Sequence, residues 1–347
     1  MKDARSRQTD ADRFCPAPKG LTEWFRLEGR ELPWRDAPHG SRDPWRTLLS
    51  EVMSQQTRLE VVVPRFLRWM AIVPTASHLA DLSEDDVLAM WAGLGYYNRA
   101  RNLHRLAKQV AGTEWPTNFG GLKGLPGVGD YTAAAVASIA FGEAVAAVDG
   151  NVERVLSRIH GIEGDLRTGS GRKTLREAAD AWILSGQAGA VNESTMELGA
   201  RVCLPRTPRC AQCPCAGACH AHLTGTVEHF PQPRARKQTV EVLDRVAVVR
   251  GAKGVLLRRA GSDELLAGHW TLPRLGLDLT ESVIKGLESC GTVRHAITHH
   301  RILWEVLEGE FAGELAGLSW VREQDLPQHI VSSLPRKALA KAGLVFA

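Results

Sequence analysis

The chain has 347 residues, of which 44% are hydrophobic, and its formal net charge is +4. This length predicts about two domains, and the hydrophobic content is sufficient for folded cores. No apolar run approaches the roughly 18 residues of a membrane span, and the first residues lack the apolar core of a secretion signal. The mildly basic balance is compatible with a nucleic-acid partner but does not identify one.

Residues 1–20 are polar, charged and without periodicity, which predicts a disordered tail. From Leu21 to about Ala221 the apolar residues recur at helical spacing. Asp43 and Pro44 provide a helix N-cap and a first helical residue, and the helix that follows carries Glu51 at the edge of its apolar face. Further helices are predicted around residues 65–70, 84–95, 100–110, 132–142, 151–161 and 174–186.

A glycine-containing turn, Leu125-Pro126-Gly127-Val128-Gly129-Asp130, lies between two of these helices. Its glycines permit a tight hairpin that presents backbone N–H groups, and the next helix begins at once. The helix dipole then points in the same direction as these groups, so the turn is predicted to bind phosphate. An ordinary helix-to-helix turn is the alternative.

Four cysteines, Cys203, Cys210, Cys213 and Cys219, follow the spacing C-x6-C-x2-C-x5-C in one proline-rich stretch. Without a secretion signal, clustered thiols favour metal binding over disulfides, and four thiolates suit a metal ion or an iron–sulfur cluster. A Zn(Cys)4 site is the alternative, although such sites more often pair two C-x2-C units. Cys215 lies inside the same stretch and leaves the choice of ligands open.

The composition changes after this loop. Residues 222–239 contain prolines, arginines and a lysine, which predicts a basic linker. From residue 240 to residue 347 the pattern predicts a small α+β domain. Val246–Val249 and Val255–Leu257 flank a turn and predict a hairpin. Other strands are predicted at 268–273, 293–306 and 318–321, and helices near 280–289 and 334–342.

Several separated motifs occur in one order: LPWR at 32–35, SEVMSQQT at 50–57, GLGYYNRARNL at 93–103, LPGVGDYTA at 125–133, VDGNVERVLSR at 148–158, NESTMELGARVC at 192–203 and the four-cysteine loop. Together they resemble the helix-hairpin-helix base-excision glycosylases, and more narrowly the MutY-type adenine DNA glycosylase family. The resemblance is dense over residues 21–221 and looser over 240–345. It implies a mainly α N-terminal part of two helical lobes, one [4Fe–4S] cluster on the loop at 203–219, and a C-terminal Nudix-like domain.

The resemblance also assigns catalytic residues. Cleaving the N-glycosidic bond of adenine requires a neutral acid to protonate the base and a carboxylate to stabilise the sugar cation. Glu51 matches the acid and Asp149 the carboxylate. Helix N-capping is the commoner reason for an aspartate at the position of Asp149, and the residue could do both. Asn151 is expected as a partner of these carboxylates, or equally as the cap itself. Tyr131 occupies the position that is a lysine in bifunctional relatives, which implies a monofunctional glycosylase.

Because the target base must leave the base stack, the resemblance also implies a base pocket. Trp34, Arg35 and Glu193 match its lining, and Glu193 would accept from the exocyclic amine of adenine. Ser54 departs from the family, in which leucine is common at this position.

Other positions match residues of the family that contact DNA outside the base pocket. Gln56 and Tyr96 match residues that enter the duplex, and Gly127 and Gly129 belong to the hairpin that contacts its backbone.

The C-terminal domain is predicted to bind rather than hydrolyse. GHWTLPR resembles the G-x-W-x-x-P turn of the Nudix-like domain, but residues 278–290 lack the carboxylate-rich metal helix of a Nudix hydrolase. Thr298 and His299 match a loop that recognises 8-oxoguanine. Ile297 replaces an aromatic residue there and Arg274 replaces a common glycine. A solvent-facing loop is the alternative.

The sequence therefore predicts a monomeric enzyme that removes adenine opposite 8-oxoguanine or guanine in double-stranded DNA. It is expected in the cytoplasm, with the nucleoid if the source is bacterial, and without a membrane partner. A mismatch thymine or uracil glycosylase is the second hypothesis. A non-catalytic DNA-binding damage sensor, using an iron–sulfur cluster structurally, is the third.

Overall fold

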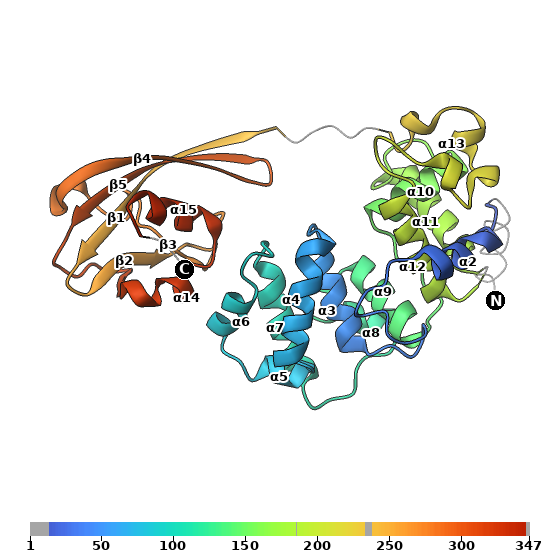
Figure 1. Ribbon diagram of the computed structural model, residues 1–347, viewed down its shortest axis with the longest axis horizontal. Helices are drawn as coiled ribbons and strands as arrows, with labels where there is room; N and C mark the ends of the chain where they lie inside the picture. Colours follow the sequence, from blue (N-terminus) through green and yellow to red (C-terminus); the bar gives the residue numbers. More distant parts are fainter. Residues whose placement is uncertain (1–13, 185, 233–237, 345–347) are drawn as a thin grey trace. The chain divides into compact units, whose positions relative to one another are not determined.

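The computed structural model describes residues 14–184, 186–232 and 238–344. They form two compact units, Met1–Asp81 with Asn102–Ala235, and Leu82–Arg101 with Arg236–Ala347. The first unit is helical, and the second contains the sheet (Figure 1). Among the described residues, no helix combines the length and hydrophobicity that crossing a bilayer requires.

The helices of the first unit include those that apolar periodicity predicts and others, at 19–28, 76–80, 119–123, 188–201 and 220–223, that the sequence did not single out. They are α2 (Lys19–Glu28), α3 (Pro44–Ser54), α4 (Leu59–Ile72), α5 (Ala76–Ala80), α8 (Phe119–Lys123), α9 (Asp130–Phe141), α10 (Gly150–His160), α11 (Gly169–Ile183), α12 (Ala188–Arg201) and α13 (His220–Leu223); α7 (Asn98–Val110) runs from the second unit into the first. The predicted cap of α3 is confirmed, since the Asp43 side chain accepts from the Arg46 N–H at 2.8 Å.

Helix α9 lies at the centre of the first unit. Every residue from Thr132 to Ala140 is buried, and most are alanine. Small side chains let neighbouring backbones approach closely, and α3, α8 and α12 all contact this helix. The arrangement brings the C-terminal half of α3, which carries Glu51, against the first turn of α9, which carries Tyr131.

Parts of the predicted tail and of the predicted linker contact the core of the first unit. Phe14 and Ala17 pack into the core beside α10 and α11, so residues 14–20 are ordered by burial; residues 1–13 lie outside the described part of the chain. Phe230 is also buried in this core, and its carbonyl accepts from Arg158 Nε at 2.9 Å. The segment of residues 222–232 is therefore anchored to the core at Phe230, and residues 233–237 lie outside the described part.

The second unit confirms the predicted α+β domain. Its strands are β1 (Val240–Gly251), β2 (Gly254–Arg259), β3 (Trp270–Thr271), β4 (Lys285–Ile297), β5 (His300–Glu310) and β6 (Leu318–Val321). Their order is β3-β2-β1-β5-β4, with β6 also paired to β2. The predicted β1–β2 hairpin is present, and β1 runs parallel to β5.

The helix predicted near residues 280–289 is wrong. A single 3-10 turn occupies Glu281–Val283, and β4 then begins at Lys285 and pairs with β5 along its length. Pairing with β5 therefore overrides the local helical signal in this segment. Gly286 and Gly291 adopt positive φ angles beside the two irregularities of the pairing. The predicted helix near 334–342 is present as α15 (Ser333–Lys341).

A segment from the helical part of the sequence packs in the second unit. Residues 82–101 contain α6 (Glu84–Met90), which contacts α14 (Leu326–His329). Tyr97 Oη donates to the Val331 carbonyl at 2.7 Å, and Arg101 Nη1 donates to the Ala267 carbonyl at 3.2 Å. The structure thus groups this segment with the sheet, whereas periodicity placed it with the helices.

Candidate active site

The central contact of the site joins α3 to α9. Tyr131 Oη donates a hydrogen bond to Glu51 Oε2 at 2.6 Å. Burial raises the pKa of Glu51 to about 7, the hydrogen bond from Tyr131 opposes this shift, and the charges of Glu193 and Asp149 add to it. Near neutral pH, Glu51 is therefore protonated in a large fraction of molecules. Burial, with the Glu51 charge, raises the pKa of Tyr131 well above its usual value, so Tyr131 remains a phenol.

Asp149 caps α10 and faces the same cavity as Glu51. Its Oδ1 accepts from the backbone N–H groups of Asn151 at 2.9 Å and Val152 at 2.8 Å, and its Oδ2 accepts from Asn151 Nδ2 at 2.9 Å. Burial raises the pKa of Asp149, whereas these hydrogen bonds favour the ionised form. The helix cap predicted for Asp149 is thus present, and the same side chain lies in the wall of the cavity.

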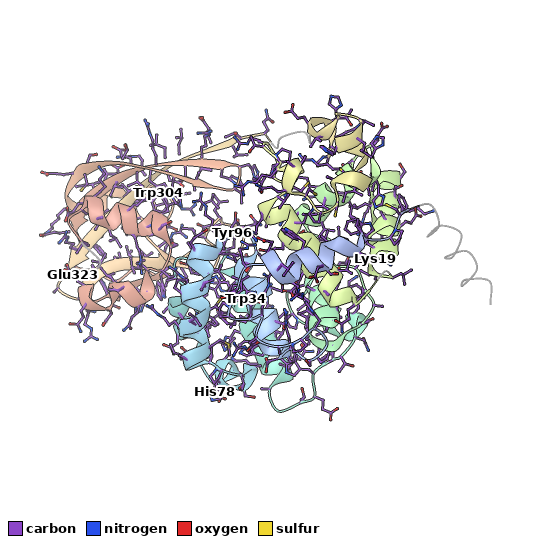
Figure 2. The ribbon with its side chains drawn as sticks, turned by 45° about the vertical axis from the view of Figure 1, so that its right-hand side comes forward. Lys19, Trp34, His78, Tyr96, Trp304 and Glu323 are labelled. Atoms are coloured by element: carbon purple, nitrogen blue, oxygen red, sulfur yellow. The ribbon has the colours of Figure 1, made fainter. Side chains whose placement is uncertain are left out.

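A cavity of about 920 Å³ brings most of the predicted residues of the first unit together. This volume lies in the range of small-molecule sites. Its lining includes the predicted residues Glu51, Tyr131, Asp149, Asn151, Trp34, Arg35, Glu193, Gln56, Gly127 and Gly129, as well as Ser54. Figure 2 marks Trp34, which is buried and meets the Phe66 ring edge-on at 5.0 Å between centroids.

Glu193 is surrounded by cationic and imidazole groups. Its Oε1 accepts from Arg35 Nε at 3.1 Å, and its Oε2 lies 2.6 Å from His39 Nε2 and 2.7 Å from Arg42 Nη1. Burial opposes ionisation, but the hydrogen bond with His39 and the charges of Arg35 and Arg42 lower the pKa of Glu193 to about 2. Glu193 is therefore an anion beside Glu51, the carboxyl group whose pKa is raised. Sequence reasoning missed His39 and Arg42, because the stretch before α3 has no periodic pattern.

The predicted hairpin joins α8 to α9. Gly127 has a φ of +75°, and a Cβ atom at this position would lie 2.4 Å from Asn102 Cβ. Gly129 is the N-cap residue of α9, so the positive end of the α9 dipole lies at this turn. The geometry is therefore suited to an anionic group such as a phosphate.

Three residues predicted to meet DNA have strained backbones. Gln56, Tyr96 and Thr298 have φ angles of 55°, 48° and 54°, and they are the non-glycine residues at positive φ in the described part of the chain. Such strain is often concentrated at functional sites. Tyr96, marked in Figure 2, is 45% exposed, and Thr298 lies in the turn between β4 and β5 beside His299. Both belong to the second unit, whereas Gln56 belongs to the first.

The four predicted cysteine ligands line one shared cavity. Cys203, Cys210, Cys213 and Cys219 all contribute to its wall. Arg158 also lines it and places Nη1 3.3 Å from Cys203 Sγ, where a cation would offset thiolate charge. Within the described residues, no three Cys, His, Asp or Glu side chains are close enough to bind one metal ion. Cys215 is 1% exposed in the core and is not part of the cavity wall. Four thiols around one space form a donor set that fits an iron–sulfur cluster.

The sequence profile of the HhH-GPD superfamily of base excision DNA repair proteins matches residues 49–182. Human adenine DNA glycosylase is 32% identical over 394 residues, which cover 91% of this chain and 72% of that protein. The chain belongs to the adenine DNA glycosylase family. Adenine DNA glycosylase of Arabidopsis thaliana is 36% identical, covering 75% of this chain and 47% of that protein.

Membership of the adenine DNA glycosylase family makes the chain a DNA glycosylase, and the predicted family is confirmed. Among solved structures, a thermostable thymine-DNA glycosylase aligns with a TM-score of 0.52 and 25% identity, covering 65% of this chain and all of that chain. This likeness supports the glycosylase architecture of the helical unit.

Proposed function

We propose that the protein is a monofunctional glycosylase that excises adenine opposite 8-oxoguanine or guanine from double-stranded DNA, acting as a monomer. The observation that carries the proposal is the buried Glu51 carboxyl, with a pKa of about 7, in one cavity with Asp149. An acid poised near neutral pH suits proton donation to a leaving base, and the family relationship supports adenine as that base.

The two carboxyl groups have complementary roles in this reaction. Neutral Glu51 donates its proton to N7 of the extruded adenine, which makes the base a better leaving group as the N-glycosidic bond breaks. Ionised Asp149, which is held by the N–H groups at the start of α10, stabilises the positive charge that develops on the deoxyribose. The ionised Glu51 then accepts a proton from the water that attacks the sugar.

Tyr131 limits the reaction to base removal. Its hydroxyl is bonded to Glu51, and its raised pKa keeps it a weak nucleophile. A lysine at this place would offer an amine that forms a Schiff base with the sugar and leads to strand cleavage. The enzyme should therefore leave an intact abasic strand.

The second unit is proposed to recognise the base opposite adenine as a Nudix-like domain. Residues 285–290 lie in strand β4 and lack a carboxylate-rich helix, which argues for binding rather than pyrophosphate hydrolysis. Thr298 and His299 occupy the β4–β5 turn, where their side chains lie 3.3 Å apart and offer a hydroxyl and an imidazole to a modified base.

We further propose that Cys203, Cys210, Cys213 and Cys219 bind one [4Fe–4S] cluster. When bound, the cluster cross-links the loop of residues 203–219 and supplies no reacting group. Arg158 holds the same loop through bonds to the carbonyls of Leu204 and Pro205 at 2.7 and 3.0 Å. The loop also carries Arg206 and Arg209, so its order would fix cations for contact with the DNA backbone.

The proposal is tested with duplexes containing A:8-oxoguanine, A:G and T:G, assayed by single turnover and alkaline cleavage of the abasic product. Adenine should be removed from the first two, and Glu51→Gln should lower the rate by about 10² to 10⁴-fold. Glu28→Gln, at an exposed position on α2, is the matched control. Undiminished activity in Glu51→Gln contradicts the mechanism.

A mismatch thymine glycosylase is the second candidate, because one of the solved structures that align with the chain is a thymine-DNA glycosylase. Faster removal of thymine from T:G than of adenine from either substrate would establish it. Tight binding of all three duplexes without base release would instead support a damage sensor.

A further inference from the structure

The loop of residues 36–43, here called the pocket loop, is fixed against α9. The Gly40 N–H donates to the Ile139 carbonyl at 2.8 Å, and Gly40 has a φ of +83°. A Cβ atom on Gly40 would lie 3.6 Å from Gly142 Cα, so the two backbones pass close together. Arg42 Nε donates to the Ala37 carbonyl at 2.8 Å and closes the loop from within. The side chains of the loop are therefore held in place by backbone contacts.

His39 reaches the cavity wall through a gap on α12. A Cβ atom on Gly189 would lie only 3.1 Å from His39 Cδ2, so the imidazole packs where this glycine leaves space. Glu193 is four residues further along α12 and therefore lies on the same face. The imidazole thus passes over Gly189 and places Nε2 2.6 Å from Glu193 Oε2.

The hydrogen bonds of Glu193 are unequally divided between its two oxygens. Oε2 accepts short bonds from His39 and Arg42, whereas the described contacts of Oε1 comprise one bond of 3.1 Å from Arg35. Because a carboxylate oxygen has two lone pairs, Oε1 keeps the greater capacity to accept from a ligand. Because ionised Glu193 accepts from His39 Nε2, this nitrogen cannot also accept from Arg42 Nη2, which lies 3.5 Å away. Arg42 binds Glu193 through Nη1 instead.

We propose that His39 is a positioning residue that, with Arg42, occupies Glu193 Oε2 and leaves Oε1 to accept from the exocyclic amine of the extruded base. The inference rests on the proposed excision of adenine and assigns a role to the pocket loop. A purine base without the exocyclic amine makes no such bond, so its removal should not depend on His39.

The experiment compares two duplexes that differ only in the target base, adenine or unsubstituted purine, each opposite 8-oxoguanine. Single-turnover rates are measured for the full-length protein and for His39→Ala. We expect His39→Ala to slow adenine removal by about tenfold, the scale of one bond to a charged group, and to change purine removal less than about twofold. His39→Gln, whose amide nitrogen can replace Nε2 as a donor, should recover most of the adenine rate.

Two controls separate positioning from folding. His78→Ala, in α5, should leave both rates unchanged. In a Glu193→Ala background, His39→Ala should have no further effect, because the two residues act through one contact. Equal losses on adenine and purine, or additive losses in the double variant, overturn the role of His39. Failure of the unaltered protein to remove adenine overturns the proposed function instead.

Discussion

Tyr131 and Glu51 are joined by a 2.6 Å hydrogen bond between the phenol hydroxyl and carboxyl Oε2, on helices whose contact positions lie 80 residues apart in the chain. The bond favours the ionised form of Glu51, whereas burial favours the neutral form. Their balance leaves the pKa of Glu51 at about 7. Tyr131 therefore limits how far burial raises the pKa of Glu51.

Replacing Tyr131 with phenylalanine should shift the pH dependence of excision. In the proposed mechanism neutral Glu51 is the active form, so the single-turnover rate should fall about tenfold per pH unit above the pKa of about 7. Tyr131→Phe removes the bond that favours ionisation, so the decline should begin at higher pH. Rates measured between about pH 5.5 and pH 9 would show this shift, with Tyr97→Phe as the control. A decline at unchanged pH would mean that another group limits the rate.

Glu51→Gln should stabilise the protein at alkaline pH while it slows excision. The folded-state pKa of about 7 exceeds the ordinary value of 4.5, so the stability that Glu51 contributes is fully present below about pH 4.5 and is lost as pH rises through about 7. Glutamine resembles the neutral form at every pH. Its free energy of unfolding should exceed that of the natural protein by up to about 3 kcal/mol at pH 8 and differ little at pH 4. Urea unfolding of both proteins at both pH values measures this. A difference in unfolding free energy that is the same at pH 4 and pH 8 would contradict the burial of Glu51.

The helix cap that Asp149 forms and the electrostatic role proposed for it can be separated by substitution. Asp149→Asn keeps an oxygen that accepts from the Asn151 and Val152 N–H groups but removes the charge, so stability should change little while excision falls by at least about 100-fold. Asp149→Ala should lose activity and also about 1 kcal/mol of stability. Ser83→Ala, which removes the cap of α6, is the control that loses stability alone. Full activity in the asparagine variant would exclude an electrostatic role for this carboxylate.

The cysteines of the loop at 203–219 should divide into ligands and a packing residue. Serine in place of Cys203, Cys210, Cys213 or Cys219 should lower iron and acid-labile sulfide per protein, because each lines the shared cavity. Cys215→Ser should retain iron and instead lose stability, since Cys215 is buried in the core. Iron determination and thermal unfolding of each variant distinguish the two groups, with Cys290→Ser in β4 as the control. Loss of iron in Cys215→Ser, with retention in one of the other four, would reassign the ligands.

Much of the helical unit could be predicted because its signals are local. Asp43 and Pro44 start α3 as the N-cap rules require, and the motifs around Glu51 and Asp149 identified both as candidate site residues. Contacts between residues far apart in the sequence have no local signal of this kind. Strand β4 depends on pairing with β5, and the pair His39–Glu193 joins residues 154 positions apart. Residues 82–101 read as helical by periodicity, yet contacts far along the chain place them in the second unit.

Replacing each of the two glycines of the hairpin with alanine should have a different effect. Gly127 has a φ of +75°, and an added Cβ would lie 2.4 Å from Asn102 Cβ, so Gly127→Ala should destabilise the fold by about 1–3 kcal/mol. Gly129 has a φ of −87° and no atom within 4 Å of an added Cβ, so Gly129→Ala should leave the melting temperature nearly unchanged. Its methyl group would still stand at the start of α9, where we expect a DNA phosphate to bind. The affinity of Gly129→Ala for an abasic-site duplex, measured at several salt concentrations, should therefore decrease without loss of fold. Unchanged affinity in this variant would mean that the hairpin does not contact DNA.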